Sequence, residues 1–455
     1  MTDNMISGEC GGRRRCRLVS ATYEGMGARW KEQLSDVSLA VYEDTPQMEE
    51  IARRVASLSM ETECFFVMDA SRVEDSLSDW HRLVPHCVPF YPLSCNDDPL
   101  LLELLTRRKQ CNLQVSTVRE LERALSLIPP SRIVFHSHLM TRKMLRLVTS
   151  LQEPLHALMV DSEESAMDAA ALNPYQPLLL RVSLSPDSDR IDLSMGMCIE
   201  EAMECIPRLI AAGVAVSGVS VQLMAEGEDM VERARVLVHL LSSLSSYPLS
   251  TLDVGDGVQS SSLLHCLLDT ANVPHLKLMA TPGRLLAASA FSLVTAIVGK
   301  RSIDAGLITR RKEEEGTHGF VYETTQSVYG VFSNRLMGEE ARCEPLVLTH
   351  SQGGGREHES AVMGSARDTM DWPERHTRLP ALAVGDCLLW KEMGAYAARE
   401  EDCFPVYYFT GRDHWERLQG GEKELMSDGG SEGETDGESD PEPDDMTECF
   451  WRVFN

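Results

Sequence analysis

Two patterns of apolar and polar positions alternate along the middle of this chain. Short apolar runs predict buried strands, and amphipathic runs between them predict helices. The expected strands are residues 64–69, 88–95, 112–116, 131–137, 155–161, 177–184, 216–223, 249–255 and 275–281. The expected helices are residues 98–108, 117–127, 141–152, 162–172, 199–213 and 229–244. Such regular alternation indicates parallel strands with crossover helices, and its span suits a (β/α)8 barrel.

The pattern changes after the last of these strands. Strand-like runs now follow one another with turns and no helical runs between them, at residues 291–301, 319–334, 381–390 and 406–411. This succession of strands without helices predicts a separate C-terminal all-β domain. The expected organisation is an N-terminal segment at 1–61 that partly joins the β domain, a barrel at 62–287, a β domain at 288–418 and a tail at 419–455.

The charge of the chain is strongly negative and partly concentrated near its end. The formal net charge is −27, and residues 422–448 hold twelve acidic residues and one lysine. Because nucleic-acid binding needs a basic surface, we expect no nucleic-acid partner. The acidic segment lacks apolar residues, which predicts a disordered tail. It is either a solvating tail or a site of phosphorylation, since Ser431, Thr435 and Ser439 each precede an acidic residue by three positions.

The compartment can be inferred from cysteines and apolar stretches. The thirteen cysteines are scattered and form no C-x-x-C pair, which predicts reduced thiols and neither a disulfide nor a zinc framework. No apolar stretch is long enough to span a bilayer, and the N-terminal residues lack the apolar core of a secretory signal. We therefore expect a cytoplasmic or nuclear protein with no membrane and no metal partner.

A series of motifs occurs in order at the expected strand ends. These are PFYPLSCND (89–97), TLDVGDG (251–257), TPGRLLAASAFSL (281–293), SVYGVFSN (327–334), VGDCLLWKEMGAYA (384–397) and PVYYFTG (405–411). Over about residues 62–416 the chain resembles the eukaryotic ornithine decarboxylase and antizyme inhibitor family. The resemblance implies an alanine-racemase-like (β/α)8 barrel of the pyridoxal-phosphate type, followed by a β domain.

Most positions with a catalytic role in that family hold other residues here. The resemblance places the Schiff-base lysine at Ser94, and a hydroxyl cannot form an imine with the cofactor aldehyde. It places the histidine that stacks on the cofactor ring at Gln222, and the glutamate that partners the ring nitrogen at Thr281. The glycine turn that cradles the phosphate contains Asp256, which puts an acid beside a dianion.

Other family positions divide into lost and retained residues. An aspartate near the barrel mouth, the substrate-amine aspartate and the partner-subunit cysteine fall at Gln114, Gly338 and Arg367. The retained residues are Arg181, Arg284, Asp368 and Tyr396. From these losses we expect a catalytically inactive pseudoenzyme that no longer binds pyridoxal phosphate.

The resemblance also bears on the oligomeric state. In the family a lysine bridges across a dimer to the aspartate that corresponds to Asp371, but the matching stretch here, residues 193–197, holds no lysine. Asp371 is therefore expected to be a surface acid, and the protein a monomer or a weak dimer.

An inactive member of this family would resemble the antizyme inhibitors. This implies that the chain binds antizyme and so regulates polyamine synthesis and uptake. The stretch that matches the family's antizyme-binding element is 135–164, in which Arg142, Lys143 and Arg146 carry positive charge at helical spacing. These residues could equally form the solvated basic face of an ordinary barrel helix.

Two alternatives to antizyme binding stay open. The chain could be a divergent amino-acid decarboxylase of putrescine biosynthesis. It could also be a polyamine-binding protein, because Asp256 and Glu226 would make the barrel mouth acidic. Cys95 has no identified histidine partner in the sequence and is interpreted as a core thiol.

Overall fold

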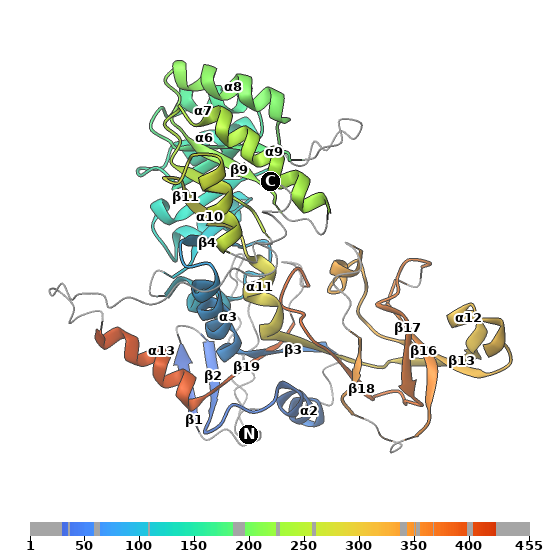
Figure 1. The fold of residues 1–455 in the computed structure, drawn as a ribbon. Coiled ribbons are helices and arrows are strands. Elements are labelled where there is room, and N and C mark those ends of the chain that lie inside the picture. The colour runs from blue at the N-terminus through green and yellow to red at the C-terminus, as the bar shows by residue number, and fades with distance from the viewer. Residues whose placement is uncertain are drawn as a thin grey trace. The chain divides into compact units, whose positions relative to one another are not determined.

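The computed structural model describes most of the chain outside its two ends. The described residues are 30–34, 37–58, 64–107, 110–184, 196–223, 228–256, 261–336, 344–349, 351, 355–366, 368–397 and 404–424. The chain forms two compact units, which are described separately below (Figure 1). Of the described residues, the barrel unit contains those from 73 to 287, and the sheet unit contains those from 30 to 72 and from 288 to 423.

Eight parallel strands close into a barrel in the barrel unit, in the order β10-β11-β4-β5-β6-β7-β8-β9. The strands are β4 (Cys87–Pro92), β5 (Asn112–Val115), β6 (Ile133–His136), β7 (Ala157–Val160), β8 (Leu178–Val182), β9 (Val216–Val221), β10 (Thr251–Asp253) and β11 (Lys277–Ala280). Each neighbouring pair is parallel. The expected (β/α)8 barrel is therefore confirmed.

Helices connect these strands, and in Figure 1 the helices labelled α6 to α10 surround them. They are α3 (Ala70–Leu83), α4 (Pro99–Thr106), α5 (Val118–Leu125), α6 (Arg142–Thr149), α7 (Glu163–Leu172), α8 (Ile199–Ala211), α9 (Glu228–Leu244), α10 (Ser261–Thr270) and α11 (Gly283–Ala287). Side-chain caps fix several starts: Thr141 accepts a hydrogen bond from Met144 N, and Ser162 accepts one from Ser165 N. A cap of this kind satisfies a backbone donor that the helix itself leaves unpaired.

The interior of the barrel is filled by apolar side chains from its strands. One cluster contains Phe90, Val134, Ala157, Met159, Leu179 and Met279, each at most 2% exposed. Strands buried on both faces are nearly continuous apolar runs, which is why the sequence pattern locates them well. The packed interior leaves the ends of the barrel as the places where polar side chains can gather.

The sheet unit contains two sheets. The seven-stranded sheet has the order β1-β2-β19-β3-β12-β18-β15, and the four-stranded sheet has the order β13-β14-β16-β17. The strands are β1 (Trp30–Leu34), β2 (Val37–Tyr42), β3 (Cys64–Asp69), β12 (Phe291–Ala296), β13 (Gly299–Asp304), β14 (His318–Glu323), β15 (Leu346–Val347), β16 (Glu357–Met363), β17 (Glu374–Pro380), β18 (Cys387–Trp390) and β19 (Val406–Gly411). Its helices are α2 (Met48–Leu58), α12 (Ala305–Thr309) and α13 (Arg412–Glu424).

One expected strand belongs to a different sheet from the one we assigned. We placed residues 64–69 within the barrel range, but β3 pairs antiparallel with β12 and parallel with β19 in the seven-stranded sheet. All six of its residues are buried. A strand that is apolar on both faces carries no signal of which sheet it joins.

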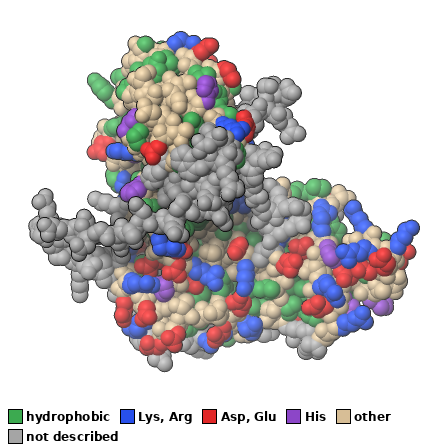
Figure 2. Space-filling view, in the orientation of Figure 1, with side chains coloured by type: hydrophobic (Ala, Val, Ile, Leu, Met, Phe, Trp, Pro, Cys, Tyr) green, Lys and Arg blue, Asp and Glu red, His purple; other side chains and the backbone are tan. Residues whose placement is uncertain are grey.

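The two ends of the chain are described only in part. Helix α13 extends to Glu424, so it includes the first residues of the expected tail. The acidic segment that follows, with Ser431, Thr435 and Ser439, lies outside the described residues. None of the helices that the structure describes is long and apolar enough to cross a membrane. On the face that Figure 2 shows, positive and negative side chains of described residues are interspersed.

The expectation that Asp371 is a surface acid was wrong. Asp371 is 0% exposed. Its Oδ1 accepts hydrogen bonds from Ser327 Oγ (2.9 Å) and Val328 N (2.9 Å), and its Oδ2 accepts one from Ala366 N (2.6 Å). The absence of the family's lysine partner suggested exposure, but the carboxylate accepts hydrogen bonds from two loops and so ties them together.

We predict that Asp371→Ala destabilises the sheet unit by at least about 2 kcal/mol, because it leaves one hydroxyl and two backbone N–H groups unpaired in a buried site. Thermal unfolding followed by circular dichroism would measure the effect. Glu313→Ala, at an exposed acid of the same unit, is the control and should have little effect. Equal unfolding temperatures for the two variants would contradict this role for Asp371.

Candidate active site at the barrel mouth

The carboxyl ends of the eight parallel strands meet at one end of the barrel, which we call the mouth. Most of the family positions singled out in the sequence lie there. Ser94 follows β4, Gln114 lies in β5, Arg181 in β8, Gln222 follows β9, Asp256 follows β10, and Thr281 and Arg284 follow β11. Active sites of such barrels are built from these strand ends and the loops after them.

A tight turn after β10 organises one side of the mouth. Asp253 accepts hydrogen bonds from Ser220 Oγ (2.7 Å) and from Gly255 N (3.1 Å). Gly255 has a φ of +73°, and a Cβ there would lie 2.2 Å from Gln222 Oε1. Glycine is therefore required, both by the backbone conformation and by the close approach of the Gln222 amide. Gln222 also donates from Nε2 to the Asp256 carbonyl oxygen at 3.4 Å.

Asp253 is a buried acid with a shifted pKa. Its side chain lies beneath the turn, and the residue is 2% exposed. Burial raises the pKa of Asp253 to about 6, although the hydrogen bonds from Ser220 and Gly255 act in the opposite direction. This carboxyl group therefore titrates close to neutral pH, at the base of the turn that shapes the mouth.

A second polar group lies at the ends of β6, β7 and β8. The Arg181 Nη1 atom lies 3.0 Å from His136 Nε2, 3.3 Å from His138 Nδ1 and 3.7 Å from Asp161 Oδ1. The two imidazole rings meet edge to face, with centroids 4.6 Å apart. Our sequence analysis found Arg181 but not the other three residues. A histidine at a strand end followed by another two positions later was the signal that could have shown them.

This group also shifts the pKa values of its members. Burial, helped by the positive charge of Arg181, lowers the pKa of His136. Burial would raise the pKa of Asp161, but the neighbouring His136 and Arg181 outweigh it, and the pKa of Asp161 is lowered. The carboxylate is thus charged and the buried imidazole neutral at pH 7.

The loop after β4 places residue 94 at the surface. Ser94 is exposed, whereas its neighbour Cys95 is 2% exposed. A Cβ at Gly283 would lie 3.3 Å from Cys95 Sγ, so the thiol packs directly against the start of α11. Cys95 therefore occupies a packed position, and only the Ser94 hydroxyl is presented to solvent.

The remaining sequence candidates lie elsewhere. Asp368 and Tyr396 belong to the sheet unit. There Asp368 Oδ1 accepts a hydrogen bond from Met370 N, and the Tyr396 carbonyl oxygen accepts one from Ser333 Oγ. Gly338, Arg367 and Glu226 lie outside the described residues.

Comparison with known proteins relates this barrel to a family. Residues 70–288 match the family described as "Pyridoxal-dependent decarboxylase, pyridoxal binding domain". Ornithine decarboxylase of Panagrellus redivivus is 25% identical over 375 residues, which cover 76% of this chain and 85% of that protein. Antizyme inhibitor 2 of Xenopus laevis is 23% identical over 435 residues, 90% of this chain and 94% of that protein. Residues 70–288 thus match the pyridoxal binding domain of such decarboxylases, and most of the chain is similar to ornithine decarboxylases and to an antizyme inhibitor.

Solved structures of decarboxylases show the same similarity at the level of the fold. Paramecium bursaria Chlorella virus arginine decarboxylase bound to agmatine has a TM-score of 0.68 at 21% identity, covering 80% of this chain and 100% of that one. Lysine/ornithine decarboxylase of Vibrio vulnificus, complexed with putrescine, has a TM-score of 0.63 at 18% identity, with 80% and 98% covered. Both structures share their fold with this chain.

These comparisons contradict two expectations from the sequence. We expected an inactive pseudoenzyme, but relatives that match are named ornithine decarboxylase, including those of Panagrellus redivivus and Schizosaccharomyces pombe. We also expected that pyridoxal phosphate binding is lost, but the matching family is itself a pyridoxal binding domain. Both expectations rested on single positions such as Ser94, and the similarity of the whole domain outweighs them.

The mouth has features that fit such a cofactor. Gln114 Oε1 is buried and accepts no hydrogen bond, so it offers an acceptor to a bound ligand. Arg181 and Arg284 bring positive charge to the strand ends, which suits a phosphate group. When bound, pyridoxal phosphate supplies an electron sink for the chemistry of amino acids. Ser94 would contact it only as a hydroxyl, because it has no amine.

We predict a distinct pH dependence from Asp253. Its pKa of about 6 in the folded protein exceeds the value of about 3.9 for an unfolded chain. The folded state therefore holds this proton more tightly, and its contribution to stability is lost as the pH rises from about 4 to about 6, by ~3 kcal/mol.

Asp253→Asn should remove this dependence. The difference in unfolding temperature between the variant and the wild type, followed from pH 4 to pH 7, should shift in favour of the variant as the pH rises. Glu122→Gln, at an exposed acid of α5, is the control. A difference that stays constant over the whole range would show that Asp253 does not titrate there.

Proposed function

We propose that this chain acts in polyamine metabolism by binding antizyme, the small protein that binds ornithine decarboxylase. The observation that carries the proposal is the exposed face of α6. The similarity to Xenopus laevis antizyme inhibitor 2 supports it, because that alignment extends over 90% of this chain, against 76% for the Panagrellus redivivus decarboxylase.

Helix α6 separates into a buried and an exposed face. Leu145 and Val148 are 4% and 1% exposed and pack toward the barrel. The exposed residues are Arg142, Lys143, Arg146 and Leu147. Lys143, Arg146 and Leu147 are spaced i, i+3 and i+4, so they lie side by side on the helix surface. The outward face of α6 therefore combines positive charge with an apolar residue.

Apolar side chains extend this surface beyond α6. Leu139, just before the helix, is 82% exposed. On α7, which packs beside α6, Met167 and Leu172 are 46% and 47% exposed. A solvated barrel helix needs charges but no exposed apolar cluster, whereas protein-binding surfaces combine both. This combination favours a protein partner over a simple solvated face.

Two further features complete the proposal. A monomer or a weak dimer would leave α6 free for a one-to-one complex with antizyme. Reduced cysteines fit the cytoplasm or nucleus, and none of the eight cysteines that the structure describes forms a disulfide. Because the exposed charges of α6 are positive, we expect the complementary surface of antizyme to be acidic and the complex to weaken as salt increases.

We predict that Arg146→Glu weakens antizyme binding at least about tenfold, because it places a negative charge against an acidic partner surface. Binding would be measured by calorimetry at low salt. Recovery of ornithine decarboxylase activity from an antizyme-inhibited mixture would show the same loss.

Arg123→Glu is a closely matched control. Arg123 is exposed and lies in the last turn of α5, another eight-residue helix of the barrel, as Arg146 does in α6. The two variants carry the same charge change at equivalent helix positions. If both bind antizyme equally well, or if the wild type does not bind it, the proposal is wrong.

Decarboxylation of a basic amino acid is the second candidate, because relatives that align with about three quarters of this chain are named ornithine decarboxylase. Release of CO2 from ornithine by the wild type with added pyridoxal phosphate would support it, and the absence of turnover would reject it.

For the cofactor itself, we predict that borohydride reduction in the presence of pyridoxal phosphate labels the peptide after β4 in Ser94→Lys. It should label this peptide neither in the wild type nor in Ser94→Arg, since only a lysine amine can be attached covalently. Mass spectrometry of that peptide is the measurement, and labelled Ser94→Arg would contradict this.

A further inference from the structure

His136, His138 and Asp161 converge at the mouth of the barrel. His136 is the last residue of β6, His138 follows two positions later, and Asp161 comes directly after β7. The neighbouring strands β6 and β7 pair in parallel, with His136 opposite Met159. One ligand atom from each of the three side chains lies within 4.8 Å of the other two. We propose that these three residues form a binding site for a divalent transition-metal ion such as Zn²⁺.

The three groups surround a single cationic nitrogen. Arg181 Nη1 lies 3.0 Å from His136 Nε2, 3.3 Å from His138 Nδ1 and 3.7 Å from Asp161 Oδ1. A guanidinium group has donors only, so the two imidazole nitrogens that face it present their lone pairs. These are the atoms and the protonation states that ligate a metal ion. Arg181 Nη1 therefore occupies the position where a metal ion would be held.

The Arg181 guanidinium cannot donate a hydrogen bond to all three of these acceptor atoms. Nη1 carries two hydrogens but faces three acceptors. Asp161 Oδ1, at 3.7 Å, is beyond hydrogen-bonding distance, and it is buried without a hydrogen-bond partner. A metal ion could bind all three atoms at once. Two imidazoles and one carboxylate form a donor set typical of zinc sites with an open position.

The three ligand atoms would have to move only slightly closer together to bind a zinc ion. Ligand atoms around a tetrahedral zinc ion lie about 3.4 Å apart, because each bond is about 2.0–2.2 Å long. His136 Nε2 and Asp161 Oδ1 are already 3.7 Å apart. His138 is exposed, and its ring can rotate closer. The main change on binding is therefore the withdrawal of the Arg181 guanidinium.

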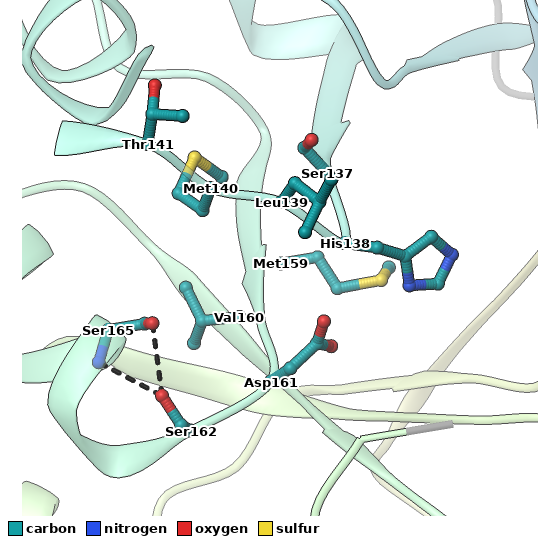
Figure 3. Close-up of a pocket in the computed structure, with 10 residues that line it drawn as sticks. All are labelled: Ser137, His138, Leu139, Met140, Thr141, Met159, Val160, Asp161, Ser162 and Ser165. Carbon is teal, nitrogen blue, oxygen red and sulfur yellow. Dashed lines mark hydrogen bonds between the residues drawn. The ribbon is translucent and has the colours of Figure 1, made fainter. Parts of the chain in front are cut away.

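An open pocket gives access to this position. It has a volume of about 400 Å³ and is lined by both His138 and Asp161. Figure 3 shows the loop after β6, with His138, on one side of this pocket and Asp161 with Ser162 and Ser165 on the other. With three protein ligands, a bound ion would keep a coordination position for water or a small ligand from the pocket.

Arg181 and a metal ion would compete for the same three ligand atoms, and this competition can be tested with variants. The wild type, His138→Ala, Asp161→Asn and Arg181→Met would be titrated with Zn²⁺ by calorimetry, and with Co²⁺ by visible absorption, which reports tetrahedral binding. We expect one ion per barrel in the wild type and affinity reduced about tenfold or more in His138→Ala and Asp161→Asn. Arg181→Met should bind at least about tenfold more tightly than the wild type, because it removes the competing cation.

A histidine outside the proposed site provides the control. His275→Ala, at an exposed histidine just before β11, should leave the affinity unchanged. Because His138 is exposed, its substitution tests the site without disturbing the core, whereas His136 is buried. Unchanged affinity in His138→Ala and Asp161→Asn, or weaker binding in Arg181→Met, would overturn the proposal. The titrations contain no antizyme, so their outcomes can be told apart from a failure of the proposed antizyme binding.

Discussion

Closure of the eight parallel strands is the constraint on which the barrel unit depends. Each strand hydrogen-bonds to two neighbours in parallel, so every carboxyl end lies at the same end of the barrel. Apolar side chains fill the interior, as the cluster from Phe90 to Met279 shows. Inside the ring of strands, polar and charged groups can therefore gather only at the ends of the barrel. Residues far apart in the sequence, from Ser94 to Arg284, reach one region for this reason alone.

The pattern of the sequence predicted the elements of the barrel well and their partners less well. Each of the eight barrel strands lies within or overlaps an expected apolar run, because a strand buried on both faces has few polar positions. Strand β3 has the same pattern but joins the other sheet. Which strand it pairs with is decided by contacts with residues more than two hundred positions away, and local periodicity holds no information about them.

The same limit applied to single side chains. The resemblance found Arg181, Gln222 and Asp256 because they occupy ordered motif positions. It could not show that Gln222 lies against Gly255, that Asp371 is buried, or that His136, His138 and Asp161 surround Arg181. Each of these facts depends on packing between segments. The expected loss of the cofactor rested on several substituted positions taken together, from Ser94 to Arg367, and the match of residues 70–288 to a pyridoxal binding family contradicts it.

One short segment contributes to both proposals. His136 ends β6, Arg142 begins α6, and the loop between them contains both His138 and the 82% exposed Leu139. The imidazole of His138 lies beside Arg181 at the mouth, while α6 presents Lys143, Arg146 and Leu147 outward. A ligand that fixes His138 also restricts the backbone next to Leu139, since the two residues are adjacent. The loop after β6 thus physically connects binding at the mouth with binding on the outer face of the barrel.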